Sequence, residues 1–254
     1  MRRLPEYSCR WFTTVMIKTL TWCRRVFVAV LCLATGAWIY AEASQWFFRL
    51  RAERLLRDLK SIHVGQSSAE AEAILGRWRI GGTKAEGCYG ENNATCYSSI
   101  FVRHQFPESL RGSAEEGAKN WLPSVLDHIG LRNSAVGAGV ITEHGVVGQR
   151  WYSEEVMLPV SEWFILGRAY EPSLGVTVIE DDRFRFLQIQ DNINPSHPFR
   201  IARRRRGSLT VSFTTEESPF ERAQLMDFRF SCITQFVTCR NEPEILPEVA
   251  ELLR

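Results

Sequence analysis

The pattern of apolar and polar positions divides the chain into a membrane-like segment and a long mixed segment. Residues 26–48 are predominantly apolar and carry one formal charge, Glu42, near the end of the run. As a helix rising about 1.5 Å per residue, this run can cross a hydrocarbon core of about 30 Å. Trp38, Tyr40 and Trp46 lie toward one end, where amphipathic rings favour lipid headgroups. The pattern predicts a transmembrane helix over 26–48, with the lipid bilayer as its partner.

Two other interpretations of this segment stay open. A helix buried in a soluble core is disfavoured because the run offers no polar face to solvent. A cleaved secretory signal is indicated by the small residues Ala41 and Ala43, although the leader over 1–25 is long for that role. A signal anchor and a cleaved signal both carry the rest of the chain across the membrane, so we expect the leader on the cytoplasmic side.

An amphipathic pattern follows the apolar run. Its apolar residues recur at helical spacing with basic residues between them: Phe48, Leu55, Leu59 and Ile62. The pattern predicts that the membrane helix continues into an amphipathic stalk helix over 49–62. Its arginines can contact anionic headgroups, each contributing about 1 kcal/mol near the surface. Alternatively, the apolar stripe packs onto the following domain.

Residues 63–254 alternate short β-like runs with turns and a few helical segments. Residues 64–78 are predicted to form a helix that Ser67 or Ser68 can cap; Glu70 lies three residues after Ser67, as a capping box requires, and Gly76 suits the end of the helix. Further helices are predicted over 113–129 and 219–226. Strands are predicted over 96–103, 135–143, 146–158, 163–170, 176–179, 184–190, 199–203 and 209–214. Consecutive strands at this spacing favour an antiparallel meander, so the predicted fold class is one α+β domain with a mostly antiparallel sheet.

The cysteines suggest the compartment of this domain. Cys9, Cys23 and Cys32 precede it, and the domain holds two local pairs, which are Cys88 with Cys96 and Cys232 with Cys239. Either pair can close a short loop as a disulfide, although four cysteines allow three pairings. A zinc site is disfavoured because the intervals exceed those of a zinc knuckle, and free buried thiols are the remaining alternative. Disulfides persist in oxidising compartments, so the local pairing predicts a non-cytoplasmic domain.

Charge excludes one class of partner and leaves the orientation open. The 254 residues hold 31 Lys and Arg against 29 Asp and Glu, a net charge of +2, which gives no reason to expect nucleic acid as a partner. The flanks of the apolar run carry similar numbers of positive charges, so the positive-inside rule does not decide the orientation.

The strongest local concentration of charge is a run of arginines in the second half of the chain. It consists of Arg200, Arg203, Arg204, Arg205 and Arg206. Guanidinium groups bind phosphate bidentately, so this run predicts a lipid or phosphate contact, placed in a hairpin turn between strands. A solvated loop tip is the alternative.

No motif in the sequence specifies a reaction, a cofactor or a metal. The histidines show no metal-binding spacing: His63, His104, His128, His144 and His197. Glu180, Asp181 and Asp182 can hold a cation together with Asp191, or form an exposed turn. We therefore expect a membrane-anchored binding or scaffold module of the cell envelope with an envelope protein as partner. The alternative is an extracytoplasmic hydrolase whose site joins distant residues.

In that alternative, His128 or His144 would act with the acidic cluster over 180–182. A catalytic role for these groups requires the fold to bring a histidine and a carboxylate within hydrogen-bond reach of one substrate.

Two segments carry a resemblance to known proteins. RAERLLRDLKSIHVGQSSAEAEAIL and RFSCITQFVTCRNEPEILPEV, together with the apolar anchor and the first cysteine loop, resemble a group of uncharacterised single-pass bacterial membrane proteins. The resemblance implies an extracytoplasmic α+β domain and assigns no catalytic residue. VGQSSAEAEAILG is also similar to the opening helix of SmpA-type outer-membrane assembly lipoproteins. Those proteins carry a lipidated cysteine after a lipobox, whereas Cys32 here follows Leu31 without the small residue that a lipobox requires.

Overall fold

The structure is a computed structural model. It describes residues 7–79, 82–90, 94–104, 134–157, 173–182, 200–205, 208–234, 239 and 241–252. The chain forms two compact units, Met1–Ala43 and Ser44–Arg254, and each is described by itself.

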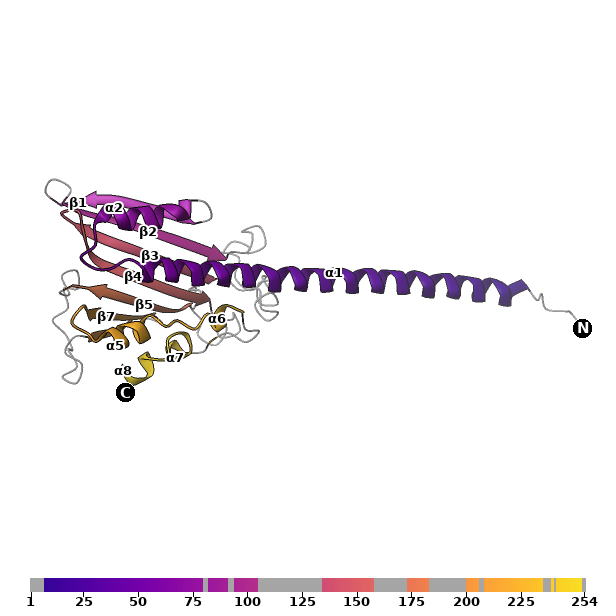
Figure 1. The fold of residues 1–254 in the computed structure, drawn as a ribbon. Helices are drawn as coiled ribbons and strands as arrows, with labels where there is room; N and C mark the ends of the chain where they lie inside the picture. The colour runs from indigo at the N-terminus through magenta and orange to yellow at the C-terminus, as the bar shows by residue number, and fades with distance from the viewer. Residues whose placement is uncertain are drawn as a thin grey trace, which may run out of the picture. The chain divides into compact units, whose positions relative to one another are not determined.

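The first unit contains the N-terminal part of helix α1, which runs without a break over Tyr7–Lys60 (Figure 1). Every side chain over 20–40 is exposed. Within the described residues, α1 is the one helix long and apolar enough to cross a membrane. The predicted N-terminal apolar helix is confirmed, and the finding supports a single-pass membrane protein.

The last four turns of α1 belong to the second unit and to its hydrophobic core. The apolar stripe predicted for this segment is buried, together with neighbours at helical spacing: Phe48, Ala52, Leu55, Leu56, Leu59 and Ile62. Of the two interpretations of the stripe, packing onto the domain is the one that the structure bears out. The C-terminal turns of α1 are therefore part of the hydrophobic core of the second unit.

The described strands of the second unit form a seven-stranded sheet in the order β1-β2-β3-β4-β5-β7-β6. The strands are β1 (Thr83–Tyr89), β2 (Thr95–His104), β3 (Ser134–Glu143), β4 (Val146–Met157), β5 (Ser173–Asp181), β6 (Arg200–Arg205) and β7 (Ser208–Thr214). Neighbours pair antiparallel except β5 and β7, which pair parallel. The α+β class is confirmed, and the meander holds from β1 to β5. The predicted meander was wrong beyond β5, because β7 lies between β5 and β6 in the sheet.

Some elements differ from the predictions or lie outside the described residues. β1 was not predicted, because its TKAEGCY sequence has a single β-branched residue, Thr83, beside Lys, Glu and Gly, which are depleted in strands. The predicted elements over 113–129, 163–170 and 184–190 lie outside the described residues.

A short helix and a 3-10 turn connect α1 to the sheet. Helix α2 covers Ser68–Leu75 and continues as the 3-10 turn η1, Gly76–Arg79. The Ser67 hydroxyl accepts a hydrogen bond from the backbone amide of Glu70 at 3.4 Å, as the capping box requires. Gly76 is the C-cap but keeps right-handed helical angles, so it passes the chain into η1 rather than stopping it.

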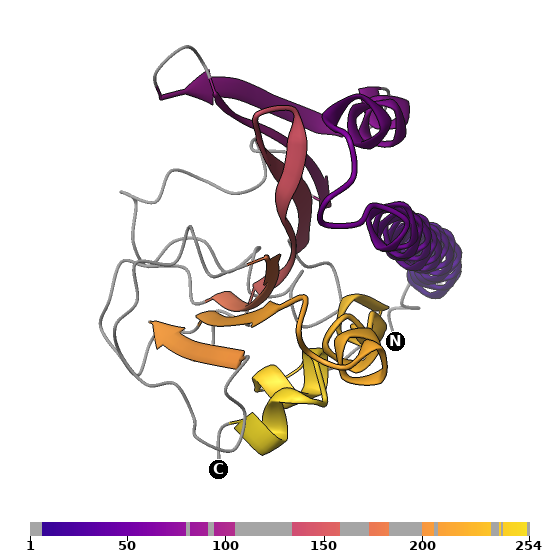
Figure 2. The ribbon, with the colours of Figure 1, turned by 60° about the vertical axis from the view of Figure 1, so that its left-hand side comes forward.

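The hydrophobic core lies on one face of the sheet. α2, the last turns of α1 and the C-terminal helices all cover this face (Figure 2). Those helices are α5 (Pro219–Leu225), α6 (Ser231–Thr234), α7 (Glu242–Ile245) and α8 (Val249–Leu252).

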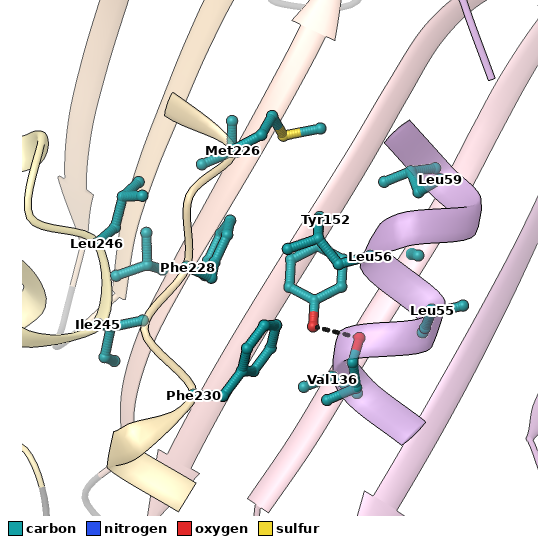
Figure 3. Packing of buried hydrophobic residues seen from close by; sticks show 14 of the residues in the cluster. Leu55, Leu56, Leu59, Val136, Tyr152, Met226, Phe228, Phe230, Ile245 and Leu246 are labelled. Atoms are coloured by element: carbon teal, nitrogen blue, oxygen red, sulfur yellow. Dashed lines mark hydrogen bonds between the residues drawn. The ribbon is translucent and has the colours of Figure 1, made fainter. Parts of the chain in front are cut away.

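Tyr152 of β4 occupies the centre of this core. Its ring lies between leucines of α1 and a group of residues from the C-terminal segment (Figure 3). The ring meets Phe228 and Phe230 edge-on, at centroid distances of 4.8 and 6.3 Å. Its hydroxyl donates to the Ala52 carbonyl at 3.5 Å, so the one polar atom of this buried ring has a partner. Tyr152 thus joins α1, the sheet and the C-terminal segment.

Candidate functional site

The described surface includes an open groove of about 460 Å³ between α1 and the segment over 227–231. Both walls belong to the second unit. α1 contributes one side at helical spacing, with Arg49, Glu53, Leu56, Arg57 and Lys60. The other side is the chain that leads from α5 to α6, with Asp227, Phe228, Arg229, Phe230 and Ser231. Four cationic and two anionic side chains line the groove, above the apolar Leu56, Phe228 and Phe230.

At one end of the groove, Arg49 is held by several partners. Its Nε donates to a Glu53 carboxylate oxygen at 2.7 Å, one helical turn away. Its Nη1 donates to the Thr234 hydroxyl at 3.4 Å, and its guanidinium lies 5.2 Å from the centre of the Trp46 ring. These contacts neutralise Arg49 locally and fix its position.

The other end and the middle of the groove differ in charge pairing. At the far end, burial lowers the pKa of Lys60, and the nearby negative charge of Asp227 opposes this shift. Arg57 and Arg229 are exposed, and neither guanidinium has an ion-pair partner among the described residues. The excess positive charge of the groove is therefore concentrated in its middle.

A buried carboxyl group lies in the core below the Arg49 end. Glu154 of β4 is fully buried, and neither of its carboxylate oxygens has a hydrogen-bond partner in the part of the chain that the structure describes. Burial raises its pKa well above the usual range of a glutamic acid, and the nearby charge of Arg49 opposes this shift. Burial therefore favours the neutral, protonated form of Glu154. Sequence reasoning missed it, although the two-residue period of β4 places it on the inward face with Tyr152 and Val156.

The predicted acidic cluster has a structural role in the fold. Glu180 and Asp181 end β5 and are buried, so the exposed-turn interpretation was wrong for them. The Glu180 carboxylate pairs with Arg150, and its other oxygen accepts from Arg222 at 3.1 Å. Asp191, the fourth predicted member, lies outside the described residues.

The histidines do not complete a catalytic set with that cluster. His144 lies in the two-residue turn between β3 and β4, with Gly145, and both residues have positive φ as a type I′ hairpin requires. Arg150, the partner of Glu180, lies six residues beyond His144 in the chain, which is about 20 Å of extended chain. His128 lies outside the described residues. Among the residues that the structure describes, no three His, Cys, Asp or Glu side chains group as metal ligands do.

The arginine run lies in a strand rather than in the predicted turn. Arg200–Arg205 forms β6 at one side of the sheet, and Arg206 lies outside the described residues. Arg200 is 4% exposed and pairs with Glu217, and also with Glu221 at 3.2 Å. The predicted lipid or phosphate contact is thus wrong for Arg200, because its guanidinium already neutralises carboxylates. The strand positions of Arg203, Arg204 and Arg205 are described, but their side chains are not.

The domain cysteines adopt the local pairing. Cys88 and Cys96 face each other across β1 and β2 with 4.0 Å between Cα atoms, and are disulfide-bonded. Cys232 of α6 is bonded to Cys239 with 5.2 Å between Cα atoms. Cys23 and Cys32 of the first unit are exposed free thiols. Both disulfides close loops of the second unit.

Comparison with known proteins adds no relative: no protein-family model, curated protein or solved structure matches this chain.

Proposed function

We propose that this protein is a signal-anchored, single-pass membrane protein whose second unit works outside the cytoplasm as a binding or scaffold module of the cell envelope. The observation that carries the proposal is the division of the thiols. The four domain cysteines whose pairing is described are disulfide-bonded, whereas Cys23 and Cys32, on the apolar helix, are free. Such bonds persist where the compartment is oxidising.

The binding role is supported by what the described site offers. The open groove presents charged side chains above an apolar floor, which suits recognition of a ligand or a protein segment. Glu180, one member of the acidic cluster that a hydrolase would need, is already paired with Arg150 and Arg222. A binding or scaffold role is therefore the better supported of the two functions, and an envelope protein remains the proposed partner.

The test is thiol alkylation of the protein in its native host, with and without reductant, combined with protease access from each side of the membrane. Of the seven cysteines, we expect three to react before reduction and the other four to react only after it. We also expect protease added from the non-cytoplasmic side to digest the domain. Alkylation of all four domain cysteines without reductant would contradict the proposal.

A further inference from the structure

The middle of the groove presents two guanidinium groups that no described side chain neutralises. Arg57 comes from α1 and Arg229 from the segment before α6, and both line the same hollow. Like charges that line one hollow repel each other, and among the described residues neither arginine has the kind of ion pair that Glu53 makes with Arg49. An anion bound between them would remove this repulsion and gain charge-assisted hydrogen bonds.

We propose that this groove binds a phosphate group between Arg57 and Arg229. Guanidinium groups are planar donors that match phosphate oxygens bidentately, and two of them on opposite walls can grip one phosphate from both sides. Asp227 and Glu53 lie toward the two ends, where Lys60 and Arg49 balance them. The anion is therefore directed to the middle rather than along the whole groove.

The apolar floor indicates that the phosphate belongs to an organic molecule. Leu56, Phe228 and Phe230 are 5%, 5% and 7% exposed and line the groove beside the two arginines. An organic group can contact the small apolar area that they present, whereas an inorganic ion cannot use it. The hollow of about 460 Å³ falls in the size range of small-molecule sites.

The position of Arg57 along α1 limits which membrane lipids can reach the groove. Trp46 and Phe47 are 51% and 68% exposed at the end of the apolar run, where aromatic side chains mark the membrane interface. Arg57 follows Phe47 by ten residues, about 15 Å along the helix axis. The headgroup layer on one side of a bilayer is only about 5 to 8 Å thick. A lipid whose chains stay in the bilayer reaches Arg57 only if its phosphate is carried on an extended headgroup, whereas a soluble organic phosphate reaches it freely.

The experiment measures binding by isothermal titration calorimetry to the full chain in non-ionic detergent. The probes are inorganic phosphate, glycerol 3-phosphate, a short-chain phosphatidylglycerol below its micelle concentration, and an acidic peptide. The variants are Arg57→Gln and Arg229→Gln, with Arg54→Gln as the matched control. Arg54 is an exposed arginine of the same helix that does not line the groove. Thermal unfolding confirms that each variant keeps its fold.

We expect each groove variant to weaken binding of glycerol 3-phosphate or of the lipid about 10-fold, and the control to leave it within about 2-fold. Preference for the lipid identifies a membrane source, and preference for glycerol 3-phosphate a soluble one. If neither organic probe binds, the proposed site is wrong. An equal loss of binding with Arg54→Gln would also overturn it, because it would show that the probes are attracted by surface charge alone. Tighter binding of an acidic peptide at the same arginines would also overturn it. Because the purified protein is used, the result does not depend on which side of the membrane the domain occupies.

Discussion

The guanidinium of Arg150 donates to the carbonyl of Leu59 at 3.0 Å, and so joins a central strand to the last turn of α1. The same nitrogen donates to the carbonyls of Lys60, at 3.2 Å, and Ile62. The last carbonyls of a helix have no partner within it, and they carry its partial negative charge. Arg150 satisfies these carbonyls from the sheet, while Glu180 balances the remaining charge.

Replacing Arg150 with methionine should therefore lower the free energy of unfolding by about 3 kcal/mol or more. The substitution leaves Glu180 buried with one cationic partner fewer, and a broken buried ion pair costs about this much. The measurement is urea unfolding of the full chain in detergent, followed by near-UV circular dichroism. Arg77→Met is the control, since Arg77 is exposed and should change stability by less than about 0.5 kcal/mol. A loss below about 1 kcal/mol for Arg150→Met would show that the contacts of Arg150 with α1 and Glu180 contribute little to the stability of the domain.

Glu154 should make the stability of the domain fall as the pH rises. Because burial raises its pKa, the folded protein keeps a proton that the unfolded chain releases above about pH 5. Folding then takes up a proton, and the free energy of unfolding falls by up to about 1.4 kcal/mol per pH unit until the folded pKa is reached.

The check is a series of unfolding curves between about pH 5 and pH 8. Glu154→Gln should remove most of the slope, since the amide does not titrate. Glu155→Gln should keep the slope, because Glu155 is exposed on the opposite face of the same strand. Equal slopes in the wild type and Glu154→Gln would contradict the assignment.

The disulfide between β1 and β2 should stabilise that edge of the sheet. Replacing both Cys88 and Cys96 with alanine should lower the free energy of unfolding by about 2 to 3 kcal/mol, because the unfolded chain gains the freedom of an open loop. Chemical denaturation of oxidised protein measures the change. Replacing Cys23 and Cys32, which are free, should leave the value unchanged. An equal effect of the two double variants would mean that lost packing, rather than the cross-link, is responsible.

A side chain at Gly139 should lower the stability of the domain, because Trp151 lies against β3 at this position. A Cβ atom at Gly139 would lie 2.8 Å from the Ser98 carbonyl oxygen and 2.8 Å from Nε1 of Trp151. The carbonyl belongs to the backbone of β2 and cannot move aside, so Gly139→Ala should cost about 1 to 3 kcal/mol. Gly76→Ala is the control, since no atom lies within 4 Å of its Cβ position and its φ is −61°. Thermal unfolding that ranks Gly76→Ala as the more damaging of the two would refute this packing.

Several features of the candidate site were accessible from the sequence, and others were not. The basic residues of α1 were recognised as possible contacts to anionic groups, because they recur at helical spacing beside an apolar stripe. Their facing wall was not recognised. Arg229 is more than 170 residues away in the chain, and no local pattern indicates which helix a distant segment will meet.

The sequence by itself determined the N-terminal apolar helix, the capping box at Ser67, most of the described strands and the α+β class. All of these depend on periodicity or on contacts within a few residues, where the chain's own geometry decides the outcome. The tertiary structure alone decided that β7 lies between β5 and β6, that Arg200 is buried among carboxylates, and that two arginines share one groove. These outcomes depend on which faces are buried together, and that choice minimises the free energy of the whole domain rather than of any one segment.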